Sequence, residues 1–174
     1  ASSEAKNYSY APDPITWNLS ESSAYVHYCP NETIQGVAIH DIPSVDKPII
    51  SDASSVILSE PLEINKFSLI YAGAQKNIGP AGLTIVIIER DFMELGNQNI
   101  PNILKYSEHS IADSMLNTPP TFAWYMAGKV FKWIKKKGGL EFFKQQNHAK
   151  ASKLYEYIDS SDFYSNKIYI ENRS

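Results

Sequence analysis

Residues 72–82 read AGAQKNIGPAG, in which one lysine, Lys76, is set among small residues and three glycines. Apolar runs flank this segment at residues 67–72 and 83–88, and the β-branched residues of LTIVII in the second run favour a strand. We therefore expect a loop between two strands that presents Lys76. A phosphate-binding Walker loop is excluded, because that motif needs Gly-Lys followed by Ser or Thr, whereas here Gln precedes the lysine and Asn follows it.

The lysine loop has two interpretations. A lysine that its loop shields from water can keep a free amine, and a free amine forms a Schiff base with an aldehyde cofactor. The alternative is a glycine-rich connection that carries a solvated lysine. The residues of the loop alone leave both interpretations open.

An aspartate upstream favours the Schiff-base interpretation. Asp52 ends a short apolar strand at residues 48–51, and one further strand separates it from Lys76. A pyridoxal phosphate site needs a carboxylate that keeps the pyridine nitrogen protonated, so that the ring can accept electrons. Ligands of such sheets collect at the carboxyl ends of the strands, where both residues would lie. A turn former or a helix cap remains the other explanation for Asp52.

Further elements extend this pattern in both directions. Strands are expected at residues 24–28 and 36–39, and a last one at residues 167–170. A helix is predicted from an N-cap at Thr118, with Pro119 and Pro120 in its first turn, to a stop at Gly138, and a second helix at residues 140–158. Nearly continuous apolar strands predict an α/β fold whose sheet is covered on both faces.

Apolar side chains at helical spacing in both helices are predicted to be core. In the first helix they are Phe122, Tyr125, Met126, Val130, Trp133 and Ile134, and in the second Phe143, Ala151, Leu154, Tyr155 and Ile158.

The composition argues against several classes of function. The 174 residues carry a net charge of −3 without a basic block, so we expect no nucleic-acid partner. No apolar run approaches the length of a membrane span. Cys29 is the single cysteine, which fits a reducing, cytoplasmic compartment. No histidine pair has a metal-ligand spacing, so no metal site is expected.

Three motifs carry a family resemblance. They are HYCPNETIQG at residues 27–36, YAGAQKNIGPAG at 71–82 and NTPPT at 117–121. In this order they resemble the phosphoserine aminotransferase family, and the likeness extends from about Ala24 to Ser174. It implies a three-layer α/β/α large domain of a pyridoxal-phosphate enzyme. It also implies amino transfer between L-glutamate and 3-phosphohydroxypyruvate, giving O-phospho-L-serine and 2-oxoglutarate in serine biosynthesis, and in some members a role in vitamin B6 synthesis.

The resemblance also implies roles for single residues. Lys76 matches the lysine that holds pyridoxal phosphate and moves the substrate proton. Asp52 matches the partner of the pyridine nitrogen, Thr33 a residue that hydrogen-bonds the ring oxygen, and Gln75 a contact to the cofactor phosphate.

Two further matches concern a second subunit. Asn117 and Thr118 match residues that reach the phosphate of the neighbouring subunit's cofactor, so the resemblance implies a homodimer. A helix beginning at Thr118 would offer free amides to that anion.

Members of that family are much longer than this chain. The resemblance therefore implies a central fragment, with residues 1–150 in the cofactor-binding large domain and residues 151–174 at the start of the connection to a small C-terminal domain. An inactive fragment that only associates with other chains is one alternative. A cysteine desulfurase is another, although those enzymes place a histidine where this chain has Gln75, and Cys29 is the only candidate thiol.

Overall fold

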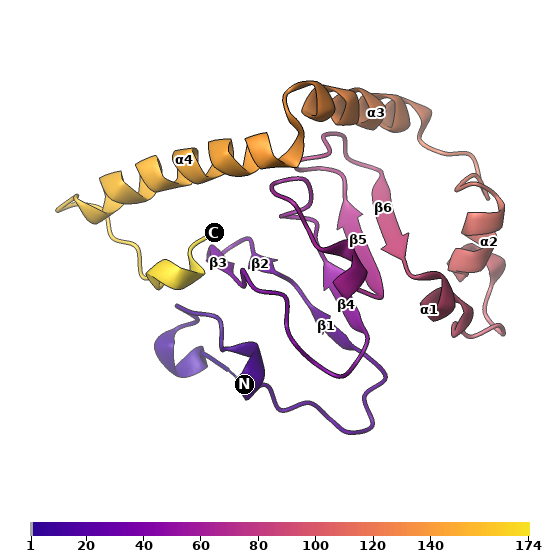
Figure 1. Ribbon diagram of the computed structural model, residues 1–174, viewed down its shortest axis with the longest axis horizontal. Helices are drawn as coiled ribbons and strands as arrows, with labels where there is room; N and C mark the ends of the chain where they lie inside the picture. The colour runs from indigo at the N-terminus through magenta and orange to yellow at the C-terminus, as the bar shows by residue number, and fades with distance from the viewer. Residues whose placement is uncertain (1) are drawn as a thin grey trace.

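The computed structural model describes residues 2–174 and is built around one four-stranded mixed sheet (Figure 1). The strands follow the order β1-β4-β5-β6; the first three are parallel, and β6 is antiparallel to β5. A separate pair of short strands, β2 and β3, is antiparallel. Their bounds are β1 Val26–Tyr28, β2 Asn31–Glu32, β3 Val37–Ala38, β4 Ile49–Asp52, β5 Leu69–Gly73 and β6 Thr84–Ile88. Five of the six lie at the predicted strands, and the mixed sheet with helices matches the predicted α/β class.

Alternation along the strands gives the sheet two different faces. In β4, Ile49 and Ser51 are buried, whereas Ile50 and Asp52 are half-buried and point to the other side. The register places Asp52 beside Tyr71 of β5. The face that carries Asp52 is therefore the one on which polar side chains of several strands can meet.

The opposite face carries the larger core. Tyr28, Ile49 and Ile70 are buried there, and partly buried residues such as Trp17 and Ile42 pack against them. These covering residues belong to loop segments before and after the short strands, not to helices. Within this chain, loops therefore cover the sheet face that the apolar pattern predicted to lie under a layer of helices.

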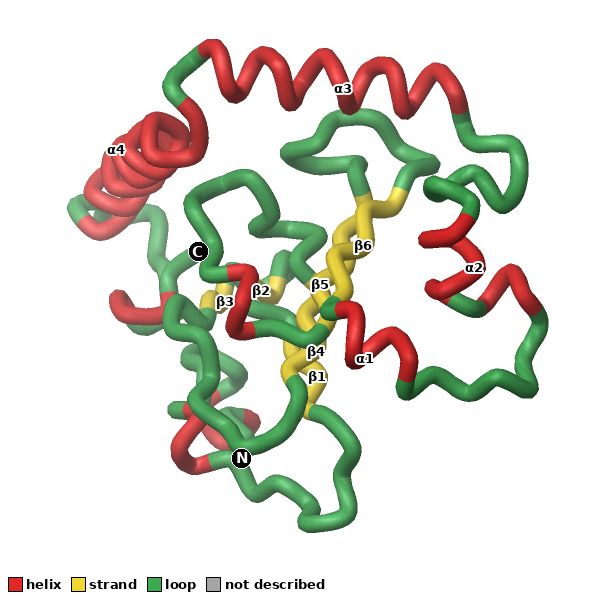
Figure 2. Tube along the Cα trace, turned by 45° about the vertical axis from the view of Figure 1, so that its right-hand side comes forward, coloured by secondary structure: helices red, strands yellow, loops and turns green. Residues whose placement is uncertain are grey.

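Four α-helices follow the sheet in sequence (Figures 1 and 2). Their bounds are α1 Arg90–Glu94, α2 Tyr106–Ile111, α3 Thr121–Lys136 and α4 Gly139–Asp159. Short 3₁₀ helices span Glu4–Lys6, Pro14–Thr16, Ile64–Lys66, Asn102–Leu104 and Ile170–Asn172. In Figure 1, α3 lies across the end of the sheet, beside the loop that joins β5 to β6.

The predicted start of the first long helix was wrong. Helix α3 begins at Thr121, with Pro120 as its N-cap at φ −71° and ψ 81°, and Thr118 lies outside the helix. A residue that precedes a proline is pushed out of the α region by the proline ring. A helix capped by Thr118 would have Pro119 as its first residue, and Pro120 disfavours the α region for the residue before it.

The predicted core of α3 was right for Ile134 but wrong for the aromatic residues in this chain. Phe122 is 75% exposed and Trp133 50% exposed, whereas the buried residues of the helix are Ala123, Ala127 and Ile134. Ala127 packs against the lysine loop, so the helix turns its small residues toward the sheet. Helical spacing identified apolar positions, but not which of them meet a neighbour.

Helix α4 is more weakly anchored. It has no fully buried residue; Phe143, Ala151, Tyr155 and Ile158 of the predicted stripe are half-buried, and Leu154 is 58% exposed. The helix runs without a break through residue 150, and the predicted division of the chain at that residue stays a prediction.

The last predicted strand does not form. The side-chain oxygen of Asn166 accepts a hydrogen bond from the amide of Ile168. The amide of Tyr169 donates a hydrogen bond to Ser9 O at 2.9 Å. These bonds lead into the 3₁₀ turn at Ile170–Asn172 in place of a regular ladder. Across residues 2–174, none of the helices combines the length and the apolar character that crossing a membrane requires.

Candidate functional site

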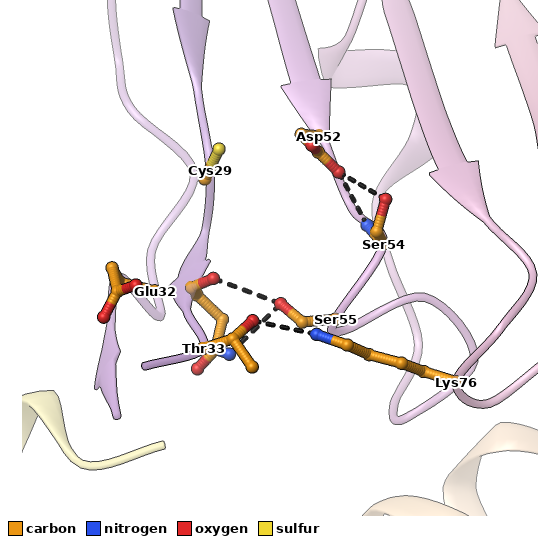
Figure 3. Close-up of a pocket in the computed structure, with 8 residues that line it drawn as sticks. Cys29, Glu32, Thr33, Asp52, Ser54, Ser55 and Lys76 are labelled. Carbon is orange, nitrogen blue, oxygen red and sulfur yellow. Dashed lines mark hydrogen bonds between the residues drawn. The ribbon is translucent and has the colours of Figure 1, made fainter. Parts of the chain in front are cut away.

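A cavity of about 200 Å³ opens at the carboxyl ends of β1 and β4 (Figure 3). The residues that line it come from segments far apart in the sequence: Cys29, Asn31, Glu32, Thr33, Asp52, Ser54, Ser55 and Lys76. In sheets of this kind, ligand-binding residues lie at the carboxyl ends of the parallel strands. The structure thus brings together three residues that the sequence singled out, Thr33, Asp52 and Lys76.

Lys76 reaches the cavity from the loop between β5 and β6. Its Nζ donates a hydrogen bond of 2.8 Å to Thr33 Oγ1, as Figure 3 shows. Lys76 is exposed, so its own loop does not provide the shielding from water that the first interpretation of this loop assumed. The reason is that Ala74 and Ile78 are the loop residues that turn inward, against Ala127 of α3, and the residues between them face outward.

Backbone hydrogen bonds hold the lysine loop in shape. The amide of Gly79 donates to Ala74 O at 2.7 Å, and the amide of Ala74 donates to Leu83 O at 2.9 Å. Gly79 has φ +121°, a conformation that side-chain-bearing residues rarely adopt, so the turn requires glycine there. Together with the buried Ile78, this turn keeps Lys76 at one place on the rim.

Asp52 is held on the other side of the cavity by Ser54. Asp52 Oδ1 accepts hydrogen bonds from Ser54 N at 3.0 Å and Ser54 Oγ at 2.6 Å, and Ser54 Oγ in turn accepts the amide of Gly73 at 3.0 Å. Burial alone would raise the pKa of the Asp52 carboxyl. The hydrogen bonds from Ser54, with smaller contributions from the neighbouring Tyr71 hydroxyl and from His27, outweigh burial and lower that pKa below its ordinary value. Asp52 is therefore a carboxylate at neutral pH.

A second pair of polar residues joins the Thr33 segment to the end of β4. Asn31 Nδ2 donates to Ser55 Oγ at 3.1 Å, and Ser55 Oγ donates to Asn31 O at 3.1 Å. Asn31, Ser54 and Ser55 were missed by the sequence reasoning. The Asp-x-Ser pattern at the end of a strand, typical of an Asx turn, was the available signal for Ser54.

Cys29 and Glu32 complete the lining. Burial, followed by the negative charges of Asp52 and Glu32, raises the pKa of the Cys29 thiol. The thiol therefore stays protonated, and a protonated thiol is a poor nucleophile.

Three other predicted site residues lie outside this lining. Gln75 is exposed, and its side-chain amide folds back over Gly73, where a Cβ would lie 2.3 Å from Gln75 Oε1. Asn117 and Thr118 are exposed in the segment before α3. Among the residues that the structure describes, no group of three or more His, Cys, Asp or Glu side chains is placed to hold a metal ion.

Comparison with known proteins identifies the family. The sequence model described as Aminotransferase class-V matches residues 3–173. The chain belongs to the class-V aminotransferase family. Within that family it is 54% identical over 175 residues to the phosphoserine aminotransferase of Hahella chejuensis, covering 100% of this chain and 48% of that protein.

Solved structures of class-V aminotransferases agree with the fold. The phosphoserine aminotransferase from Bacillus circulans subsp. alkalophilus has a TM-score of 0.94 at 42% identity, over 99% of this chain and 48% of that chain. A phosphoserine aminotransferase with bound PLP, from Trichomonas vaginalis, has a TM-score of 0.92 at 44% identity, over 97% and 47%. The predicted fold class, part of the α/β fold of a pyridoxal-phosphate-dependent transferase, is thereby confirmed. The chain spans about half the length of the relatives it matches.

The site in this member of the class-V aminotransferase family combines an amine, a hydroxyl and a carboxylate around one cavity. The amine of Lys76 can add to a carbonyl carbon, and the carboxylate of Asp52 can hold a positive charge on a ring nitrogen. Thr33 adds a neutral hydroxyl in hydrogen-bond contact with Lys76.

Proposed function

We propose that this chain carries the lysine-bearing part of a pyridoxal-phosphate-dependent phosphoserine aminotransferase. The proposed reaction is amino transfer between L-glutamate and 3-phosphohydroxypyruvate, giving O-phospho-L-serine and 2-oxoglutarate. The observation that carries the proposal is that the Lys76 amine and the Asp52 carboxylate line the same cavity. The names of the relatives support the choice of substrates.

The residues present fit pyridoxal phosphate. When bound, this cofactor supplies an aldehyde that condenses with amines and a ring that accepts electrons while its nitrogen is protonated. Lys76 offers the amine for the aldehyde and Asp52 the charge for the ring nitrogen. Thr33, already in hydrogen-bond contact with Lys76 Nζ, would bond the ring oxygen next to the aldehyde.

In the reaction we assign Lys76 a second task. Its amine would take the proton from the substrate Cα and release it to the cofactor C4′. One side chain would thus act first as general base and then as general acid. The exposure of Lys76 fits this task, because the side chain must reach both cofactor and substrate.

A second copy of the chain completes the proposal. Asn117 and Thr118 are exposed and outside the cavity of their own chain, as expected of residues that would contact the cofactor phosphate of a neighbouring subunit. We therefore propose a homodimer. A cytoplasmic location is part of the same proposal, since both substrates are soluble metabolites.

Sulfide release from cysteine, the competing chemistry on this fold, is disfavoured. The only cysteine lines the cavity, but its raised pKa leaves it protonated, whereas a desulfurase needs a thiolate.

The first prediction concerns the substrate. The full-length protein loaded with pyridoxal phosphate should form 2-oxoglutarate from glutamate with 3-phosphohydroxypyruvate at a kcat/KM at least about 100-fold above that with hydroxypyruvate, because the lost phosphate contacts are charge-assisted. A coupled assay for 2-oxoglutarate measures both rates. Equal rates with the two acceptors would contradict the proposed substrate. The isolated 174-residue chain serves as the comparison, and ordinary activity of that chain would exclude the association-only alternative.

The second prediction tests the place of Gln75. Gly73→Ala puts a methyl group 2.3 Å from Gln75 Oε1, so the flexible amide must move away from the position proposed for the cofactor phosphate. We expect an affinity for pyridoxal phosphate about tenfold lower, as for a lost hydrogen bond to a charged group. Fluorescence titration of the apo protein measures it.

Gly128→Ala is the matched control for this substitution. Gly128 lies in α3 with no atom within 4 Å of the added Cβ, and alanine there should raise stability by about 0.5–1 kcal/mol without changing cofactor affinity. An unchanged affinity in Gly73→Ala would remove Gln75 from the proposed site.

A further inference from the structure

Two polar side chains, those of His27 and Tyr71, lie on the same face of the sheet as Asp52. Tyr71 of β5 is the register partner of Asp52 of β4, and His27 of β1 pairs with Ile50, two residues before Asp52. All three side chains therefore project from the same face. His27 Nε2 lies 3.0 Å from the Tyr71 hydroxyl oxygen, and the two rings stack with centroids 5.9 Å apart at 22°.

The protons available on these side chains determine which of them donate hydrogen bonds and which accept. Asp52 and Tyr71 are neighbours in the strand register, and an ionised carboxylate only accepts hydrogen bonds, so a bond between the two side chains would use the single Tyr71 proton. Burial, followed by the charge of Asp52, raises the pKa of Tyr71, so the hydroxyl keeps that proton. With the Tyr71 proton used in this way, the Tyr71 oxygen would accept from His27, and Nε2 of His27 would carry hydrogen. Cys29 and Tyr106 are the other titratable groups near Tyr71, and neither supplies a cation.

We propose that His27 and Tyr71 are positioning residues for Asp52, connected as His27 Nε2–H to Tyr71 Oη and Tyr71 Oη–H to the Asp52 carboxylate. Ser54 holds Asp52 only through Oδ1. Tyr71 adds a contact from the neighbouring strand, and His27 orients Tyr71 from across the sheet. This restrains the carboxylate that, under the proposed function on which the inference rests, faces the pyridine nitrogen.

The network is tested first without cofactor, in the full-length protein. Long-range ¹H–¹⁵N NMR of labelled histidine reports which ring nitrogen of His27 carries hydrogen, and hydrogen on Nε2 is expected. Carboxyl ¹³C titration is expected to show a higher pKa for Asp52 in Tyr71→Phe than in wild type, because one bond to the charged form is lost. A His27 with hydrogen on Nδ1 alone, or an Asp52 titration unchanged in Tyr71→Phe, overturns the proposal.

Matched variants distinguish a hydrogen-bonding role of His27 from a packing role. Tyr28→Phe removes a hydroxyl from the buried face of the same sheet and should leave the Asp52 titration unchanged. His27→Gln keeps an N–H donor and should preserve the wild-type titration, whereas His27→Leu should move it in the same direction as Tyr71→Phe. If His27→Gln and His27→Leu shift Asp52 equally, His27 acts through packing and the proposal fails.

With cofactor, Tyr71→Phe is expected to lower kcat about tenfold and leave KM for glutamate unchanged. Absence of transamination in the wild type would overturn the proposed function while leaving the NMR signals in place, so the two failures can be told apart.

Discussion

Lys76→Ala is expected to abolish transamination, with a loss of at least about 1,000-fold in kcat. General acid–base work by one side chain contributes about 10²–10⁴-fold, and the proposed anchor for the cofactor is lost as well. The variant should also lose the visible absorption that pyridoxal phosphate acquires when a lysine of the protein holds it. Steady-state rates and absorption spectra of the full-length protein measure both effects.

The fold should survive this substitution. The hydrogen bond from Lys76 to Thr33 is exposed, so its loss should change the free energy of unfolding by no more than about 1 kcal/mol. Lys66→Ala is the control: it removes an exposed lysine that pairs with Glu63 at 3.0 Å, and both activity and spectrum should stay at the wild-type level. A Lys76→Ala variant with a tenth of the wild-type rate would refute the assignment of Lys76.

Asp52→Asn is the second large effect, with an expected loss of about 100-fold in kcat. Asparagine keeps an oxygen that can accept the two hydrogen bonds from Ser54, so the local structure is preserved. It removes the negative charge that we assign to the pyridine nitrogen, and a lost preorganised electrostatic contact costs about this much. Asp46→Asn, on the exposed loop before β4, is the control and should be active.

The same variant has a predicted pH dependence of stability. The folded state lowers the pKa of Asp52 below the value of about 3.9 for an unfolded aspartate. A lowered folded pKa contributes stability that is present above the unfolded value and is lost as the pH falls through the folded value. Urea unfolding should therefore show wild type more stable than Asp52→Asn at pH 7, with the difference shrinking in acid. A difference that grows in acid would contradict the direction of this shift.

Local patterns in the sequence were sufficient for the sheet but not for the surfaces of the helices. The β-branched run at residues 83–88 became β6, and the apolar run that ends at Asp52 became β4. In α3, by contrast, Phe122 and Trp133 are exposed although their spacing suggested burial. A helical repeat shows that a residue is able to be buried. Whether it is buried depends on which element lies opposite, and in this chain the small residue Ala127 meets the lysine loop.

The sequence by itself was sufficient to select Lys76 and Asp52 as candidate site residues, because an isolated lysine in a glycine-rich turn and an aspartate at a strand end are local features. It also determined their neighbourhood, since consecutive parallel strands end at one edge of a sheet. Only the tertiary structure decided which groups hold them. Ser54 reaches Asp52 through a tight turn, and strand register places Tyr71 beside Asp52; a shift of one residue in register would turn Tyr71 to the other face.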